Sequence, residues 1–328
     1  MRTLVVGAGA TGGYFGAQLA AAGRDVTFLV RPGRAAALRE SGLVVRSPRG
    51  DVRVARPRLV TAAGLRGAEQ DGAGQDGAYD LVLLGVKAYG LDGAIDDMAP
   101  AVGEHTMILP MLNGMRHMEV LEKRFGAGAL LGGVCYVATT LAPDGSIHQL
   151  KDMQRLMFGD RQDPDSERIH AVEAELGDAG FATRLLSDPV AAMWLKWVTL
   201  ASLGAITCLM RGAIGDVVAA PGGEEFARGV VAECLAVAEA SGSPLTEAQQ
   251  AGVYASMTER GAPTTSSMYR DLRQGNRVEA DQIVGDMVAR GSGLGVRTPL
   301  LAVAYAHLGV YQASLPSAEP ATRESSAG

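Results

Sequence analysis

The chain has 328 residues, of which 47% are hydrophobic and 5% aromatic, and it carries a formal net charge of −6. This length suits two domains with sizeable cores, and the negative charge excludes a broad nucleic-acid-binding face. The three cysteines are widely spaced, as expected of reduced thiols in the cytoplasm. The five histidines form no cluster with metal-ligand spacing, so no metal site is expected.

The N-terminal segment predicts a dinucleotide-binding turn. Thr3–Val6 has the pattern of a buried strand and Tyr14–Ala22 that of a helix. Between them lies a G-x-G-x-x-G fingerprint made of Gly7, Ala8, Gly9, Ala10, Thr11 and Gly12. The first glycine allows a tight turn, the second lets the backbone approach a pyrophosphate, and the third lets the helix pack closely on the strand. Because a strand precedes the motif and a helix follows it, we expect these six residues to bind the cofactor.

The second strand, Asp25–Val30, leads into Arg31, with Arg34 three residues later. NAD-specific enzymes place an acidic residue here, which binds the ribose 2′-hydroxyl. A guanidinium instead makes a charge-assisted contact with a 2′-phosphate. Arg31 therefore predicts NADP(H) as the cofactor, the alternative being an ordinary solvated arginine at a strand end.

The rest of the first half alternates between strands and helices. Strand-like runs recur at residues 43–45, 52–60, 80–86, 106–110 and 130–140. This alternation predicts an α/β domain over residues 1–187 with a Rossmann-type, doubly wound parallel sheet. The glycine-rich polar segment 64–77 is expected to be a flexible surface loop.

Two polar side chains follow neighbouring buried strands. Lys87 follows the strand at 81–86, and Asn113 follows the strand at 108–112. Ligands bind at this carboxyl edge in doubly wound sheets. Both residues are therefore candidate ligand contacts, although either is also a common turn or surface residue.

From Asp188 onward helical periodicity dominates, with Asp188 as N-cap and Pro189 in the first turn. Helices are predicted at residues 190–210, 223–241, 246–259, 277–289 and 299–311. These form a mostly α-helical substrate and catalytic domain at 188–313, followed by a disordered tail at 314–328. The uncharged run 197–210 is too short to span a bilayer, so no membrane association is expected.

Lys196 stands out in the first of these helices. It is the only charged residue between Asp188 and Arg211, and Trp194 and Trp197 flank it. A lysine in such a helix either extends to solvent or is held for proton transfer.

Together these features resemble the ketopantoate reductases (2-dehydropantoate 2-reductases) over nearly the whole chain. Besides the fingerprint and Arg31, the resemblance rests on Val86-Lys87-Ala88, Asn113-Gly114-Met115, Trp194-Leu195-Lys196, Ser266-Ser267-Met268 and Glu279. It implies a cytoplasmic, homodimeric oxidoreductase of pantothenate biosynthesis, which uses NADPH to reduce a small keto acid or ketone.

The resemblance also implies roles for single residues. Lys196 is the general acid that protonates the ketone oxygen, and Glu279 holds the lysine, substrate and cofactor in register. Ser267 binds the carboxylate or hydroxyl end of the substrate. The remaining implied contacts are Asn113 with substrate and cofactor, Lys87 with both, and Thr139 with the cofactor.

The chain departs from the family where ketopantoate-specific members carry substrate-binding asparagines after the lysine. It has Leu200 and Gly204 at those spacings, and Ile214 where a further polar contact is expected. We therefore expect an apolar substrate pocket, widened at Gly204, and a substrate less polar than ketopantoate. The alternatives are an imine or opine-type reductase and a non-catalytic NADPH sensor. Retention of Lys196 and Glu279 argues against the sensor.

Overall fold

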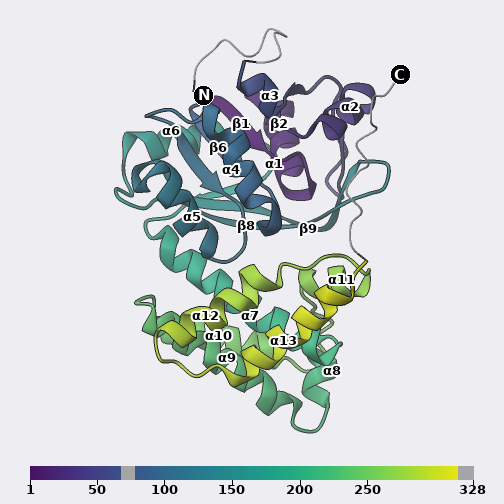
Figure 1. Ribbon diagram of the computed structural model, residues 1–328, viewed down its shortest axis with the longest axis vertical. Coiled ribbons are helices and arrows are strands. Elements are labelled where there is room, and N and C mark those ends of the chain that lie inside the picture. Colours follow the sequence, from purple (N-terminus) through teal and green to yellow (C-terminus); the bar gives the residue numbers. More distant parts are fainter. Residues whose placement is uncertain (68–77, 317–328) are drawn as a thin grey trace, which may run out of the picture. The chain divides into compact units, whose positions relative to one another are not determined.

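The computed structural model describes residues 1–67 and 78–316 (Figure 1). The chain divides into two compact units, Met1–Trp197 and a second that begins at Val198, so the division falls within helix α7 (Pro189–Met210). The domain boundary expected between residues 187 and 188 stays a prediction. Most of the predicted loop at 64–77 and most of the predicted tail at 314–328 lie outside the described residues.

A five-stranded parallel sheet forms the centre of the first unit, with the order β5-β2-β1-β6-β7. Its strands are β1 (Arg2–Val6), β2 (Asp25–Leu29), β5 (Arg58–Val60), β6 (Leu81–Leu84) and β7 (Met107–Pro110). The direction of winding reverses between β1 and β6, and ligands bind at such a switch point. The predicted doubly wound sheet is confirmed.

The helices of the first unit cover both faces of this sheet. They are α1 (Ala10–Ala21), α2 (Pro32–Ser41), α3 (Ala62–Leu65), α4 (Leu91–Met98), α5 (Arg116–Phe125) and α6 (Glu167–Leu176), with short 3₁₀-helices η1 (Ala88–Gly90), η2 (Ala99–Ala101) and η3 (Ala127–Ala129). Val5 and Leu83 belong to a core shared with α1 and α6, whereas Leu4 and Val82 belong to a core shared with α4 and α5. Alternate strand residues thus bury opposite faces, as a parallel sheet requires.

A second sheet, with the order β10-β9-β3-β4 and with β8 paired to β9, was not predicted. Its strands are β3 (Leu43–Arg46), β4 (Val52–Val54), β8 (Leu131–Leu141), β9 (Ile147–Asp160) and β10 (Ala182–Leu185). The assignment of runs 43–45, 52–54 and 130–140 to one parallel sheet was therefore wrong. The reason is the antiparallel β8–β9 hairpin, whose pairing no local periodicity reveals. Both sheets contribute to the core around α1.

The second unit is helical, as predicted. After α7 it contains α8 (Ile214–Ala219), α9 (Gly223–Ala240), α10 (Glu247–Met257), α11 (Ser267–Arg273), α12 (Asp286–Gly293) and α13 (Pro299–Ser314). A π-helical turn, η4 (Asp281–Gly285), precedes α12, so the helix expected from Arg277 begins only at Ala280. The short helices α8 and α11 were not predicted.

Helix α7 matches the predicted helix at 190–210 to within one residue, but it is longer than the uncharged run 197–210 inside it. The uncharged run was judged too short to span a bilayer, but the whole 22-residue helix is long and apolar enough, with a mean hydropathy of 1.4. Of its most apolar window, 67% is buried inside the protein. This burial is typical of the core helix of a soluble protein.

Candidate active site

The fingerprint loop joins β1 to α1 and has the geometry that its glycines predict. Gly7 has φ +91°, as the tight turn requires, and its N–H donates to the Leu29 carbonyl oxygen at 3.0 Å, which continues the β1–β2 pairing one residue beyond β1. A Cβ on Gly12 would lie 2.2 Å from the Gly7 oxygen, so only glycine fits there. Gly85, after β6, is equally restricted, since its Cβ would lie 2.7 Å from Gly12 Cα. These close approaches bring β1, α1 and β6 together at the switch point.

Gly9 provides the open side of the loop. A Cβ added to Gly9 would meet no atom within 4 Å, and Gly9 directly precedes the first turn of α1. Ala10 and Thr11 begin this turn half-buried, and the turn contains no acidic residue. Free space beside the positive end of a helix suits a pyrophosphate. The residues present therefore fit a dinucleotide.

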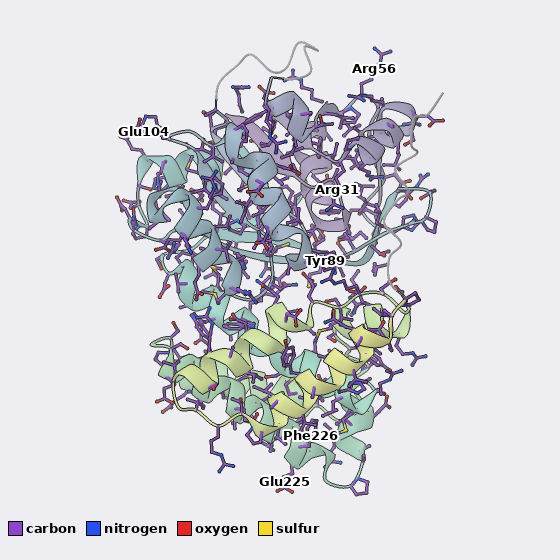
Figure 2. The ribbon with its side chains drawn as sticks, viewed as in Figure 1. Arg31, Arg56, Tyr89, Glu104, Glu225 and Phe226 are labelled. Carbon is purple, nitrogen blue, oxygen red and sulfur yellow. The ribbon has the colours of Figure 1, made fainter. Side chains whose placement is uncertain are left out.

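The two arginines after β2 have different surroundings. Arg31, labelled in Figure 2, is exposed where α2 begins, and its side chain has no acidic partner among the described residues. Arg34 instead donates to two backbone carbonyl oxygens, of Ala8 at 3.3 Å and of Gly145 at 3.0 Å. Of the pair, Arg31 is the one whose guanidinium is open to an anionic ligand.

The other predicted cofactor contacts are Lys87 and Asn113, which follow two neighbouring strands, and Thr139, which lies on a third. Lys87 is exposed after β6, and Asn113 is half-buried after β7, in a turn completed by Gly114 with φ +81°. Because β6 and β7 are neighbours, both residues share the carboxyl edge of the first sheet with the fingerprint. Thr139 is half-buried on β8 of the second sheet, beyond an irregularity in the pairing with β9.

Lys196 is buried, with 8% of its surface exposed. Its Nζ donates a hydrogen bond to the Cys135 carbonyl oxygen at 2.7 Å and lies 5.5 Å from the centre of the Tyr136 ring. Both partners are on β8, so the first unit itself holds the ammonium. The structure thus favours the held lysine over the alternative in which Lys196 extends to solvent.

Buried groups near Lys196 are kept neutral. His117 on α5 is fully buried, and this burial, together with the Lys196 charge, lowers its pKa to about 3. Burial also raises the pKa of the Cys135 thiol to about 11. At neutral pH both groups are therefore uncharged, so Lys196 has neither a second cation nor an anion from this pair beside it.

The second unit carries the remaining candidates. Ser266 is a buried N-cap of α11, which accepts a hydrogen bond from the Tyr269 N–H at 2.9 Å and contacts Thr207 Oγ1 at 2.9 Å. Its hydroxyl is therefore structural, whereas that of Ser267 is exposed at the first position of α11. Glu279 is half-buried and directly precedes Ala280 and the π-helical turn η4, a feature frequent at functional sites.

The prediction that Gly204 widens a pocket was wrong. Gly204 is buried, and a Cβ on it would lie 2.6 Å from Met268 Cε, so the methionine side chain fills the space. Ile214 is fully buried in the helical unit, and Leu200 is half-buried. Leu200 and Ile214 are still apolar where amides or other polar groups were expected, but Gly204 does not enlarge a pocket beside them.

Comparisons with known proteins give one consistent family. The description "Ketopantoate reductase PanE/ApbA" matches residues 3–163, and "Ketopantoate reductase PanE/ApbA C terminal" matches residues 188–312. The chain is 33% identical to the uncharacterized oxidoreductase YkpB of Bacillus subtilis, over 95% of this chain and 99% of that protein.

Solved structures agree with this result. The 2-dehydropantoate 2-reductase of Geobacter metallireducens has a TM-score of 0.81 and 28% identity, over 94% of this chain and 99% of that one. The ternary structure of D-mandelate dehydrogenase with NADH and anilino(oxo)acetate has a TM-score of 0.82 over 96% and 99% of the two chains. Because the identity to this dehydrogenase is 20%, that likeness shows the fold alone.

Proposed function

The chain belongs to the ketopantoate reductase family, as its sequence motifs predicted, and from this premise we propose that it is an NADPH-dependent reductase of a 2-keto acid or ketone. The observation that carries the proposal is Lys196, a buried ammonium held at 2.7 Å by the Cys135 carbonyl oxygen. Cofactor binding alone does not require such a lysine. Its burial in an apolar helix suits proton transfer.

The cofactor would be held at the carboxyl edge of the first sheet. Gly9 and the first turn of α1 would face the pyrophosphate, because they leave free space beside N–H groups. Arg31 would bind the 2′-phosphate, since its guanidinium is exposed. The further contacts we propose are Lys87, Asn113 and Thr139. When bound, the reduced nicotinamide supplies a hydride.

The protein side of the reaction is a proton transfer. As the substrate carbonyl carbon takes the hydride, negative charge develops on its oxygen, and Lys196 Nζ donates a proton there. The carbonyl becomes a hydroxyl, and the neutral lysine is reprotonated from water. Such general acid catalysis contributes ~10²–10⁴ in rate. Glu279 would orient the lysine and substrate, and the exposed hydroxyl of Ser267 would bind the substrate carboxylate.

We propose a substrate less polar than ketopantoate, because the half-buried Leu200 offers no hydrogen bond. A place in pantothenate biosynthesis is the alternative, should ketopantoate be the best substrate. By family resemblance we propose a cytoplasmic homodimer with domains at residues 1–187 and 188–313.

The direct test is NADPH oxidation by the purified protein with a panel of 2-keto acids, ketones and mixtures of keto acid with amine. We expect turnover of 2-keto acids, with NADPH preferred to NADH. Faster turnover of the amine mixtures would support an imine or opine-type reductase. Tight NADPH binding without oxidation by any substrate would support a sensor and contradict the proposal.

A further inference from the structure

Arg34 connects two loops that are far apart in sequence. From the first turns of α2, its Nε donates to the carbonyl oxygen of Ala8, in the fingerprint, at 3.3 Å. Its Nη2 donates to the carbonyl oxygen of Gly145, in the turn between β8 and β9, at 3.0 Å. The planar guanidinium is suited to this task because its donors point in fixed, diverging directions.

The β8–β9 turn is built to present the Gly145 carbonyl oxygen. The turn is closed by a hydrogen bond from Ala142 N–H to Ser146 O at 2.8 Å, and Asp144 accepts from the Ser146 hydroxyl at 2.6 Å. Gly145 has φ +82°, and a Cβ there would lie 2.8 Å from Arg34 Nη1. The glycine thus serves both the turn and the approach of the arginine.

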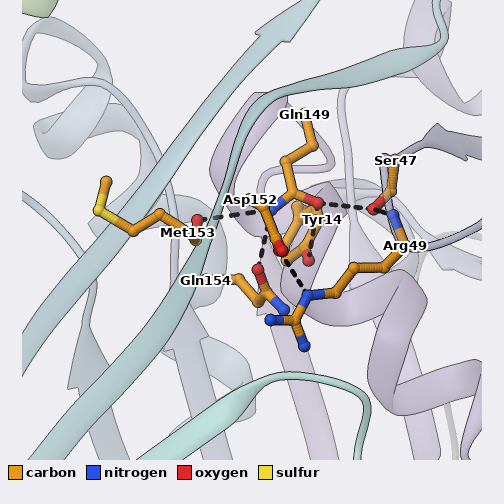
Figure 3. Close-up of polar contacts among 7 residues, drawn as sticks. All are labelled: Tyr14, Ser47, Arg49, Gln149, Asp152, Met153 and Gln154. Atoms are coloured by element: carbon orange, nitrogen blue, oxygen red, sulfur yellow. Dashed lines mark hydrogen bonds and ion pairs between the residues drawn. The ribbon is translucent and has the colours of Figure 1, made fainter.

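A second connection runs beside the first, from α1 to β9. The Tyr14 hydroxyl donates to Gln149 Oε1 at 3.3 Å, and the Ser47 hydroxyl donates to the same oxygen at 2.7 Å (Figure 3). Tyr14 and Gln149 are both buried. Helix α1, which begins in the fingerprint, is therefore fixed to the hairpin as well.

The same hairpin holds Lys196. Cys135 and Tyr136, which contact its ammonium, lie on β8, and Gly145 follows the end of that strand. The β8–β9 hairpin therefore contacts the proposed general acid from β8, and Arg34 joins its turn to the proposed cofactor loop.

We propose that Arg34 is a positioning residue, which fixes the fingerprint loop to the β8–β9 hairpin and so sets the place of the cofactor relative to Lys196. This inference rests on the proposed function. It separates two arginines that the sequence pairs: Arg31 selects the 2′-phosphate, whereas Arg34 orders the loop for either dinucleotide.

The test compares Arg34→Gln with Arg31→Gln through the dissociation constants of NADPH and NADH. Arg34→Gln should weaken both cofactors by the same factor, about ten-fold, because it removes two hydrogen bonds from a charged donor. It should also lower kcat at saturating NADPH, because a small misplacement is costly in catalysis. Arg31→Gln should weaken the binding of NADPH and leave that of NADH unchanged. Arg34→Lys should restore little of the lost affinity, since one ammonium cannot reproduce the two diverging hydrogen bonds of the guanidinium.

Hydrogen exchange of the cofactor-free protein gives a readout that needs no ligand. Amides of residues 7–12 and 142–146 should exchange faster in Arg34→Gln than in the wild type. Gly145→Ala should produce the same pattern while keeping the arginine. Gly50→Ala is the matched control, because Gly50 also has a positive φ, of +116°, but open space around it.

If Arg34→Gln weakened the binding of NADPH but not of NADH, Arg34 would be a phosphate ligand and the proposal would be overturned. Unchanged affinities, kcat and exchange in a folded variant would overturn it as well. A wild-type protein that binds neither dinucleotide would instead refute the proposed function, even if the exchange data showed that Arg34 orders the loop.

Discussion

The carboxyl edge of the first sheet and the helical positions around Ile214 differ in how exposed their residues are. At the sheet edge, Gly9 faces open space and Arg31 is exposed, so both can meet a ligand. In the helical unit Ile214 is fully buried, and Met268 occupies the space beside Gly204. The sheet edge thus leaves room for a ligand, whereas the protein's own side chains fill the space around Ile214 and Gly204.

The largest effect is expected at Lys196, the proposed general acid. Lys196→Ala should lower kcat by roughly 10² or more, because the developing oxyanion loses its proton donor. The affinity for NADPH should change little. Steady-state kinetics and a cofactor titration measure the two quantities. Lys151→Ala, at an exposed lysine on β9, is the control and should keep full activity. An active, folded Lys196→Ala protein would refute the general acid.

Substrate preference is the corresponding test of the helical side. A polar group left unpaired in a pocket costs ~1–3 kcal/mol, so kcat/KM for an apolar 2-keto acid should exceed that for ketopantoate by about 10- to 100-fold. Leu200→Asn with Gly204→Asn should shift the preference towards ketopantoate. Because a Cβ at position 204 would lie 2.6 Å from Met268 Cε, the shift should be larger when Met268→Ala is added.

The contrary result is simple to recognise. If the unmodified protein reduces ketopantoate more efficiently than every apolar analogue, the apolar positions do not select the substrate. The helical unit would then select the same substrate as the ketopantoate-specific members of the family despite its different residues, and the proposed preference for a less polar substrate would be wrong.

Arg31 tests cofactor selection at the sheet edge. Hydrogen bonds to charged groups contribute ~1.5–3 kcal/mol, so Arg31→Ala should weaken NADPH binding about ten-fold or more. NADH binding should change little, because it lacks the 2′-phosphate. Fluorescence titration with both cofactors measures the difference. Arg56→Ala, at another exposed arginine of the first unit (Figure 2), should alter neither affinity. Equal losses for both cofactors in Arg31→Ala would place Arg31 elsewhere.

Much of the sheet edge could be predicted from the sequence, because its signals are local. The fingerprint needs only a strand, a short glycine pattern and a helix in succession, and Arg31 follows at a fixed spacing. The contacts that define the rest are not local. Arg34 meets Gly145 across 111 residues, and the partner of Gly204 is Met268, which belongs to a different helix. Neither pairing has a trace in the surrounding sequence.

The smallest effect concerns the acid stability that His117 contributes to the first unit. Burial holds the pKa of His117 at about 3, below its ordinary 6.5. The unfolded chain therefore takes up this proton first, and stability is lost as the pH falls from about 6.5 towards 3. At about pH 5.5, one unit below the ordinary value, the loss is about 1 kcal/mol. The stability advantage of the wild type over His117→Leu, followed by thermal unfolding, should shrink by that amount between neutral pH and this value.

His170→Gln is a control with the opposite sign. His170 is exposed, and the carboxylates of Asp165 and Glu173 raise its pKa. Its contribution is therefore present at low pH and lost as the pH rises, so removing it should make the wild-type advantage grow on acidification. If the difference between wild type and His117→Leu stayed constant with pH, His117 would not be buried in its neutral form, and the neutral surroundings described for Lys196 would be wrong.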